Sequence, residues 1–237
     1  LILITSMGIY GFLSSAYQET ANKEGNSEAR IVLIETKRDN VKEQLEVYTE
    51  EKTSINEALK MADTVIFEYA GTALIDALNA EKNIILIDNG KVIGSGKIED
   101  MLTRFDLPIS HGVRATSIIE ANIVGRDENY ELMHLDFSGE IFLVADNRSA
   151  IGQTIRLRIS ARDVSLTKER QSNTSILNIF KAVVDDVMPE GKSQVMIRLK
   201  IKDSIILSCI TLKSAEMLNI KIGSKVYAQI KSVALLS

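Results

Sequence analysis

Three short segments in the last third of the chain place hydroxyl side chains next to predicted strand ends. Residues 173–178 precede a predicted strand, 210–214 precede a predicted helical turn, and 228–233 end a predicted strand. Hydroxyl donors, free backbone N–H groups at the start of a helix and one positive charge together bind a tetrahedral dianion, and Lys231 would supply the charge. Taken singly, each segment is equally explained by turn residues that satisfy neighbouring backbone groups.

The composition excludes several other kinds of chemistry. The 237 residues include 28 Lys+Arg and 32 Asp+Glu, which give a net charge of −4, so we expect no nucleic-acid partner. Two His and one Cys are too few for a zinc ribbon or a disulfide framework. His111 and His134 have no second His or Cys at ligand spacing, so no metal site is predicted. The single Cys209 fits a reducing compartment.

The first 80 residues divide into an apolar segment and a segment rich in charged residues. Residues 1–18 carry no charged side chain and approach the roughly 20 apolar residues of a membrane-spanning helix. A buried helix, or an effect of where the sequence begins, would explain them as well. Residues 19–80 are rich in charge, and apolar side chains recur there every seven residues, which predicts a charged helical region. Packing on one neighbour and self-association as a coiled coil both remain open.

The remainder of the chain predicts mainly β structure. Asp88-Asn89-Gly90 predicts a hairpin turn, because Asn-Gly readily adopts positive φ. A short helix is expected over 95–102 and a helical turn over 214–218. Short strands separated by turn glycines suggest small barrels. The strands are predicted at 118–124, 131–135, 141–145, 154–159, 181–187, 194–200, 204–210 and 225–230.

Motifs for nucleotide hydrolysis are not found in the sequence. Gly96-Lys97 is followed by Ile98, whereas a phosphate loop needs Ser or Thr after the lysine to hold magnesium. Asp88 follows an apolar run, but a hairpin turn explains it without a metal. No Gly-x-Ser-x-Gly nucleophile context is present. We therefore predict no ATP site and no catalytic residue in this chain.

From about residue 84 onward the chain resembles the C-terminal part of the ATP-binding subunit of molybdate ABC importers. Residues 88–102 resemble the last strands and helix of the family's nucleotide-binding domain. Residues 158–166 resemble its arginine–aspartate–valine–serine strand, and 174–236 resemble one complete Mop unit. The helix at 55–63 resembles the one that follows the switch histidine, but Thr53 stands where that histidine would be. Residues 1–52 do not resemble the ATPase.

The resemblance implies a fold and a set of ligand-binding residues. The expected fold class is α+β, with an N-terminal helical segment followed by mainly-β, OB-like small barrels of the Mop/TOBE type. Molybdate or tungstate would be the ligand, bound between two copies of the chain as a homodimer. Leu177 stands where Mop units often carry an arginine, which lowers the expected affinity. The implied oxyanion-binding residues are Ser175, Thr211, Ser214, Lys231 and Ser232.

The sequence thus predicts a regulatory oxyanion-binding part of a molybdate importer's ATP-binding subunit, without ATPase activity of its own. Its partners would be a second copy and the transporter's membrane subunit, at the cytoplasmic face of the cell membrane. The alternative is a membrane-anchored coiled-coil scaffold with a structural β-barrel cap; a molybdenum storage protein is a lesser one. The predicted parts are 1–18, apolar; 19–80, charged and helical; 81–112, a nucleotide-binding-domain remnant; and 113–237, a regulatory β region with a Mop unit at about 172–237.

Overall fold

The structure is a computed structural model that describes residues 2–5, 31–33, 64–67, 83–88 and 91–236. The chain divides into two compact units, Leu1–Met101 and Leu102–Ser237. Residues 102–112, which the sequence pattern groups with 81–101, belong to the second unit.

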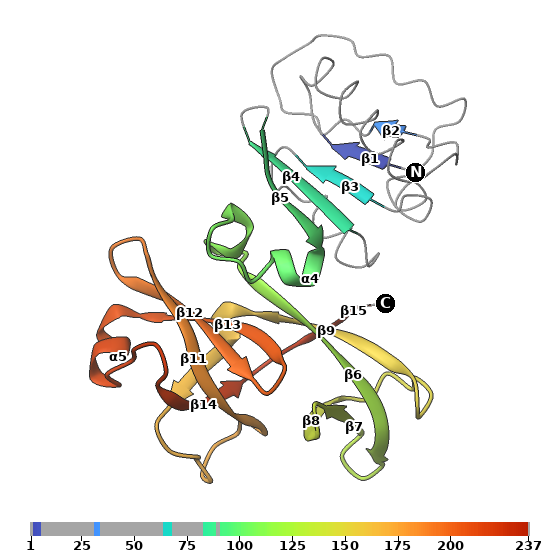
Figure 1. Cartoon of the computed structure of the whole chain (residues 1–237). Helices are drawn as coiled ribbons and strands as arrows, with labels where there is room; N and C mark the ends of the chain where they lie inside the picture. Colours follow the sequence, from blue (N-terminus) through green and yellow to red (C-terminus); the bar gives the residue numbers. More distant parts are fainter. Residues whose placement is uncertain (1, 6–30, 34–63, 68–82, 89–90, 237) are drawn as a thin grey trace. The chain divides into compact units, whose positions relative to one another are not determined.

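The described part of the first unit is a five-stranded sheet with the order β2-β1-β3-β4-β5 (Figure 1). The first four strands in this order run parallel, and β5 pairs antiparallel with β4. Asp88 pairs with Lys91, so a two-residue connection joins β4 and β5, as the hairpin prediction requires. The elements are β1 (Ile2–Thr5), β2 (Ile31–Leu33), β3 (Thr64–Phe67), β4 (Asn83–Asp88), β5 (Lys91–Lys97) and the short helix α4 (Ile98–Met101).

The prediction of helix in the N-terminal part is wrong at three places. Strand β1 lies inside the apolar segment 1–18, and β2 and β3 lie inside the charged region 19–80. These runs are only three or four residues long and apolar, and a short apolar run fits a buried parallel strand as well as a helix turn. The rest of the predicted membrane helix and of the heptad helix lies outside the described residues.

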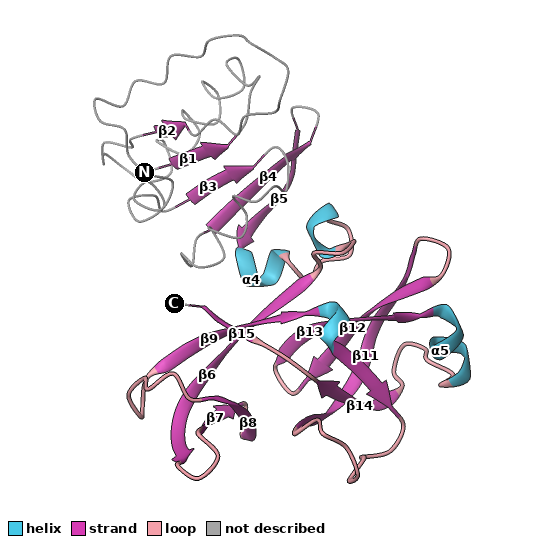
Figure 2. Cartoon of the chain, turned by 180° about the vertical axis from the view of Figure 1, so that it is seen from behind, coloured by secondary structure: helices cyan, strands magenta, loops and turns pink. Residues whose placement is uncertain are grey.

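The second unit contains two five-stranded sheets, and this confirms the prediction of a mainly-β region (Figure 2). One sheet has the order β15-β9-β6-β7-β8 and the other β10-β14-β11-β12-β13. Three short helices accompany them: η1 (Pro108–Ser110), η2 (Ala161–Asp163) and α5 (Leu212–Met217). The strands are β6 (Thr116–Asp127), β7 (Leu132–Phe137), β8 (Glu140–Ala145), β9 (Thr154–Ser160), β10 (Val164–Thr167), β11 (Asn178–Glu190), β12 (Gln194–Ile201), β13 (Ser204–Thr211), β14 (Lys225–Ile230) and β15 (Ala234–Leu236).

The two sheets are built from two successive five-strand repeats that exchange their last strands. Strand β10 follows β9 in the chain but pairs with β14, and β15 follows β14 but pairs with β9. Ser208 on β13 donates its hydroxyl hydrogen to the carbonyl oxygen of Val164 on β10 at 2.7 Å, so the second sheet curls round and brings its two outer strands together. Each sheet is therefore completed by a strand from the other repeat.

The two repeats share a β-bulge and a backbone hydrogen bond from a glycine at corresponding positions. The first strand of each repeat is bulged after the same position, between Ile123 and Gly125 in β6 and between Val184 and Asp186 in β11. At that position Gly152 donates to the carbonyl of Ile123, and Gly223 donates to the carbonyl of Val184, each at 2.8 Å. Both glycines have positive φ, +88° and +82°, a region that side chains with a Cβ rarely adopt.

One hydrophobic core serves both repeats. Side chains from both sheets form a single buried cluster. At its centre Phe180 of β11 stacks on Phe142 of β8, with ring centroids 5.2 Å apart, and meets Phe137 of β7 edge-on at 5.8 Å. The aromatic contacts therefore join the first strand of the second repeat to the β7–β8 hairpin of the first.

The side chain of Asn178 forms two hydrogen bonds with the backbone of β8. Its side-chain oxygen accepts from the backbone N–H of Leu143, and its side-chain nitrogen donates to the Leu143 carbonyl, both at 2.8 Å. We expect Asn178→Ala to lower the free energy of unfolding by about 1–3 kcal/mol, because two partly buried backbone groups lose their partners. Urea denaturation measures this, and Ser172→Ala at an exposed position in the preceding loop is the control, expected to change stability little. An Asn178→Ala chain as stable as the parent would contradict this role.

Candidate functional site

Lys231 and Ser232 lie on the crossover between β14 and β15, and both are exposed. The backbone N–H of Lys231 donates to the carbonyl of Asp163 at 2.9 Å, and the Ser232 hydroxyl donates to the Asp163 carboxylate at 2.9 Å. Asp163 ends η2 on the equivalent crossover between β9 and β10. The two crossovers therefore touch, and in this arrangement the Ser232 hydrogen is already given to a carboxylate.

Thr211 and Ser214 form the cap of α5. The Thr211 hydroxyl oxygen accepts from the backbone N–H of Ser214 at 3.1 Å, and the two side-chain oxygens lie 2.7 Å apart. Threonine is a favoured residue at this position because it satisfies an N–H that the helix leaves unpaired. The hydroxyl pair shares one hydrogen bond internally, so one hydroxyl hydrogen is left to point outward. The predicted helical turn is confirmed, two residues earlier than expected.

Ser175 lies exposed in the loop before β11. The neighbouring Thr174 hydroxyl accepts from the N–H of Ile176 at 3.1 Å, which turns the chain locally. Leu177, at the position where a further donor was expected, is also exposed, with 59% of its surface accessible. It therefore offers an apolar surface where an arginine would have offered hydrogen bonds.

The strand register divides the five predicted residues into two groups. Asn178 pairs with Ile230, so Ser175 and the Lys231–Ser232 crossover adjoin the same end of the β11–β14 pair. Thr211 pairs with Gln194, which in turn pairs with Glu190 at the other end of β11. In the part of the chain that the structure describes, no hydrogen bond joins the two groups. One copy of the chain does not bring all five residues to a single point.

Two polar residues near these groups were not singled out from the sequence. Asp163 holds the Ser232 hydroxyl and the Lys231 backbone, and Asn178 fixes the start of β11 against β8. Asp163 stands in the arginine–aspartate–valine–serine segment that the resemblance had highlighted, which is the one signal that could have found it. A carboxylate beside the predicted anion donors opposes a dianion electrostatically.

We also looked in the described residues for a reactive thiol, a metal site and a membrane-spanning helix. Burial raises the pKa of the Cys209 thiol above its ordinary value, so Cys209 is a neutral thiol at neutral pH. Within residues 2–5, 31–33, 64–67, 83–88 and 91–236, no three His, Cys, Asp or Glu side chains are grouped so as to hold a metal ion. No helix among those residues has the length and apolar character needed to cross a membrane.

The chain is similar in sequence to curated import proteins. It is 39% identical to the molybdenum import ATP-binding protein ModC of Albidiferax ferrireducens over 168 residues, which are 71% of this chain and 46% of that protein. It is 35% identical to the protein of the same name from Hahella chejuensis over 183 residues, 77% of this chain and 51% of that protein. Residues 174–236 match the family model of the TOBE domain. The resemblance to the ATP-binding subunit of molybdate importers is confirmed.

The chain spans about half the length of the ModC proteins it matches. All five predicted oxyanion-binding residues fall within the TOBE domain, residues 174–236. Among solved structures, the chain is similar to the cytoplasmic molybdate-binding protein ModG with molybdate bound, at 20% identity and a TM-score of 0.45, over 54% of this chain and 98% of that one. A molybdate binding protein from Sporomusa ovata is similar at 26% identity and a TM-score of 0.25, over 26% of this chain and 90% of that one.

Proposed function

We propose that this chain is the regulatory part of a molybdate importer's ATP-binding subunit and that its TOBE domain binds molybdate or tungstate. The observation that carries the proposal is the position of the TOBE match, which contains every predicted donor, in a chain related to molybdenum import proteins. The exposed Lys231 supplies the positive charge that a tetrahedral dianion requires.

The proposed site is formed by two copies of the chain. Ser175, Lys231 and Ser232 from one copy would face Thr211 and Ser214 from the other, because the register separates these groups within one copy. An anion that binds the dimer more tightly than the separate chains shifts the equilibrium toward the dimer, and the size of the shift is set by the difference between the two affinities. In the importer this pairing would report internal oxyanion to the membrane subunit, at the cytoplasmic face of the membrane.

We propose further that this chain does not turn over ATP alone. Phosphoryl transfer needs a phosphate cradle and a magnesium ligand, and Gly96-Lys97 is followed by Ile98 rather than a hydroxyl residue. The chain would act on ATP hydrolysis elsewhere in the transporter, through the arrangement of the subunits.

Calorimetric titration of the compact unit, residues 102–237, with molybdate, tungstate and sulfate tests the proposal. We expect heat of binding with one oxyanion per chain, hence two per dimer, and a shift from monomer to dimer in light scattering as the anion is added. The shift follows because an anion held by two copies lowers the free energy of the dimer only. Absence of heat at millimolar molybdate would remove the sensing function, and binding without dimerisation would remove the shared site.

A further inference from the structure

His111 is held between two hydrogen-bond acceptors. Its Nδ1 atom lies 3.2 Å from the Glu190 carboxylate, and its Nε2 atom lies 2.9 Å from the carbonyl oxygen of Phe105. The imidazole also lies against the Phe105 ring, with centroids 6.0 Å apart. The side chains of His111 and Glu190 are only 23% and 21% exposed, so water does not compete freely for these bonds.

Both contacts can be hydrogen bonds at the same time only when both ring nitrogens carry a proton. A backbone carbonyl can only accept a hydrogen bond, and an ionised carboxylate can only accept as well. The Glu190 carboxylate also accepts a hydrogen bond from the backbone N–H of Gly112 at 3.1 Å. A neutral imidazole has one N–H and could satisfy only one of its two partners. The geometry therefore suits the imidazolium, which has one N–H for each of the two partners.

The surrounding charges come from β11, β12, η2 and the segment before His111, all in the same unit. Arg198 of β12 lies over the Phe105 ring at 5.6 Å and is paired with Asp185 at 2.6 Å and with Asp186 at 4.0 Å. The pKa of the Cys209 thiol on β13 is raised chiefly by burial; the charge of Arg162 lowers it, and the charge of Glu190 raises it. In the segment before His111, Arg104 pairs with Asp106 and lowers the pKa of that carboxyl. Among the residues that the structure describes, Glu190 is the carboxylate paired with the imidazole.

The contact joins two parts of the chain that are 79 residues apart. His111 belongs to the segment 105–112, whose Phe105 is packed with Met196 and Cys209 in a small second core. Glu190 is the last residue of β11, inside the TOBE domain, and pairs with Gln194, the neighbour of Thr211 on β13. The imidazolium therefore connects the segment that enters the β region to the strand ends that lead to α5.

We propose that His111 is a proton-operated latch that fastens the segment 105–112 to the end of β11. With both nitrogens protonated, Glu190 and the Phe105 carbonyl are held together and the N–H of Gly112 is covered. Loss of one proton removes one of the two bonds, so the latch closes at low pH and opens as the pH rises. An ordinary histidine changes charge at about pH 6.5, which places such a device in the physiological range. The proposal does not depend on oxyanion binding.

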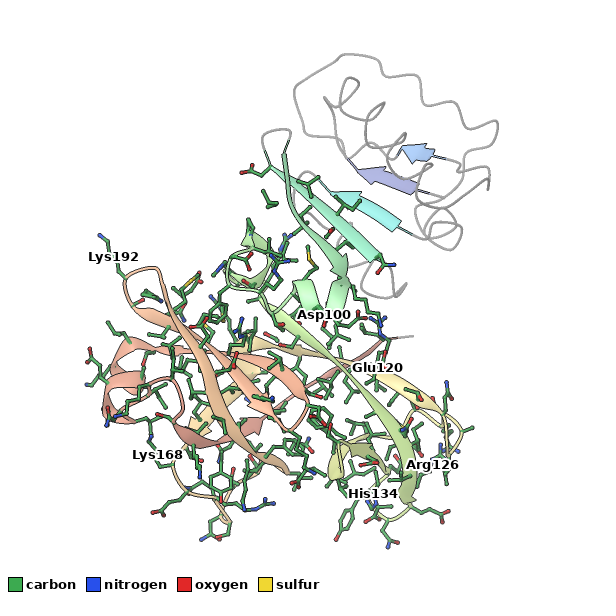
Figure 3. The ribbon with its side chains drawn as sticks, in the orientation of Figure 1. Asp100, Glu120, Arg126, His134, Lys168 and Lys192 are labelled. Atoms are coloured by element: carbon green, nitrogen blue, oxygen red, sulfur yellow. The ribbon has the colours of Figure 1, made fainter. Side chains whose placement is uncertain are left out.

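Two observations on the full chain, made between pH 5 and pH 8, test the latch. Nitrogen NMR of the imidazole rings reports which nitrogens carry protons, and hydrogen exchange reports the protection of the Gly112 amide relative to an open chain at the same pH. His134, the other histidine, lies on β7 at the far side of the unit from Lys192, which is two residues beyond Glu190 (Figure 3). It is therefore an internal control for effects of the substitutions at a distance from the latch.

We expect both nitrogens of His111 to carry protons when the latch is closed, and the Gly112 amide to lose protection as His111 loses one of them. In Glu190→Gln, which keeps the shape but removes the charge, His111 should lose its proton at lower pH while His134 is unchanged. Gly112 should then exchange roughly threefold to tenfold faster at neutral pH, as expected for one lost hydrogen bond. In His111→Gln the protection of Gly112 should no longer depend on pH.

Three results would overturn the latch. Nitrogen NMR could show a proton on only one nitrogen of His111 across the whole pH range. Glu190→Gln could leave the protonation of His111 unaltered, which would make Glu190 a structural acceptor only. The protection of Gly112 in His111→Gln could keep the pH dependence of the parent chain, which would assign that dependence to another group.

Discussion

Replacing Phe180 by alanine is expected to lower the free energy of unfolding of the second unit by about 3–5 kcal/mol. Phe180 is 2% exposed and contacts Phe142 and Phe137, which belong to the other repeat. Truncation leaves a cavity between the two sheets, and neither sheet can collapse into it without moving the strand that the other sheet has contributed. The decrease in the free energy of unfolding should therefore lie toward the upper end of this range for replacing a phenylalanine by alanine.

The same substitution tests whether the two repeats unfold together. Because one large buried cluster spans both repeats and the last strands are exchanged, urea denaturation of residues 102–237 should show one transition in the parent chain and in Phe180→Ala. Leu177→Ala, three residues earlier and exposed, is the matched control and should change stability by less than about 0.5 kcal/mol. Two separate transitions, with one repeat still folded, would show that exchange does not couple the repeats.

Most strands of the second unit could be predicted from local pattern. Strands such as β12 and β13 alternate or run apolar over five or more residues between turn residues, and that pattern is local to the chain. The exchange of β10 and β15 could not be predicted in this way. These strands are four and three residues long, and a run of that length carries no information about which distant strand will pair with it.

The candidate site shows the same division between local and long-range information. The cap of α5 by Thr211 follows from residue type and position, because a hydroxyl before a helical turn satisfies an unpaired N–H. The bond from Ser232 to Asp163 joins residues 69 positions apart and exists because the two crossovers meet. The apolar runs at Ile2–Thr5 and Thr64–Phe67 fit either helix or strand locally, and only their parallel pairing decides between the two.

Replacing Lys231 by alanine is expected to weaken molybdate binding about 10- to 150-fold, the effect of losing one charge-assisted bond of about 1.5–3 kcal/mol. The fold should be preserved, because the contact of Lys231 with Asp163 is made by its backbone N–H, which alanine retains. Lys200→Ala is the matched control, since Lys200 of β12 is also exposed and belongs to neither group of proposed donors. Calorimetric titration of residues 102–237 and both variants measures the difference.

Asp163 supplies a second variant with the opposite expected sign. Its carboxylate accepts the Ser232 hydrogen bond and places a negative charge beside the proposed anion. Asp163→Asn keeps an acceptor for Ser232 but removes that charge, so molybdate binding should strengthen while Lys231→Ala weakens it. Because exposed charges are screened, both effects should shrink as salt is raised. If Lys231→Ala binds as tightly as the parent chain and Asp163→Asn does not bind more tightly, the anion is held elsewhere, and these crossovers serve only to exchange the strands.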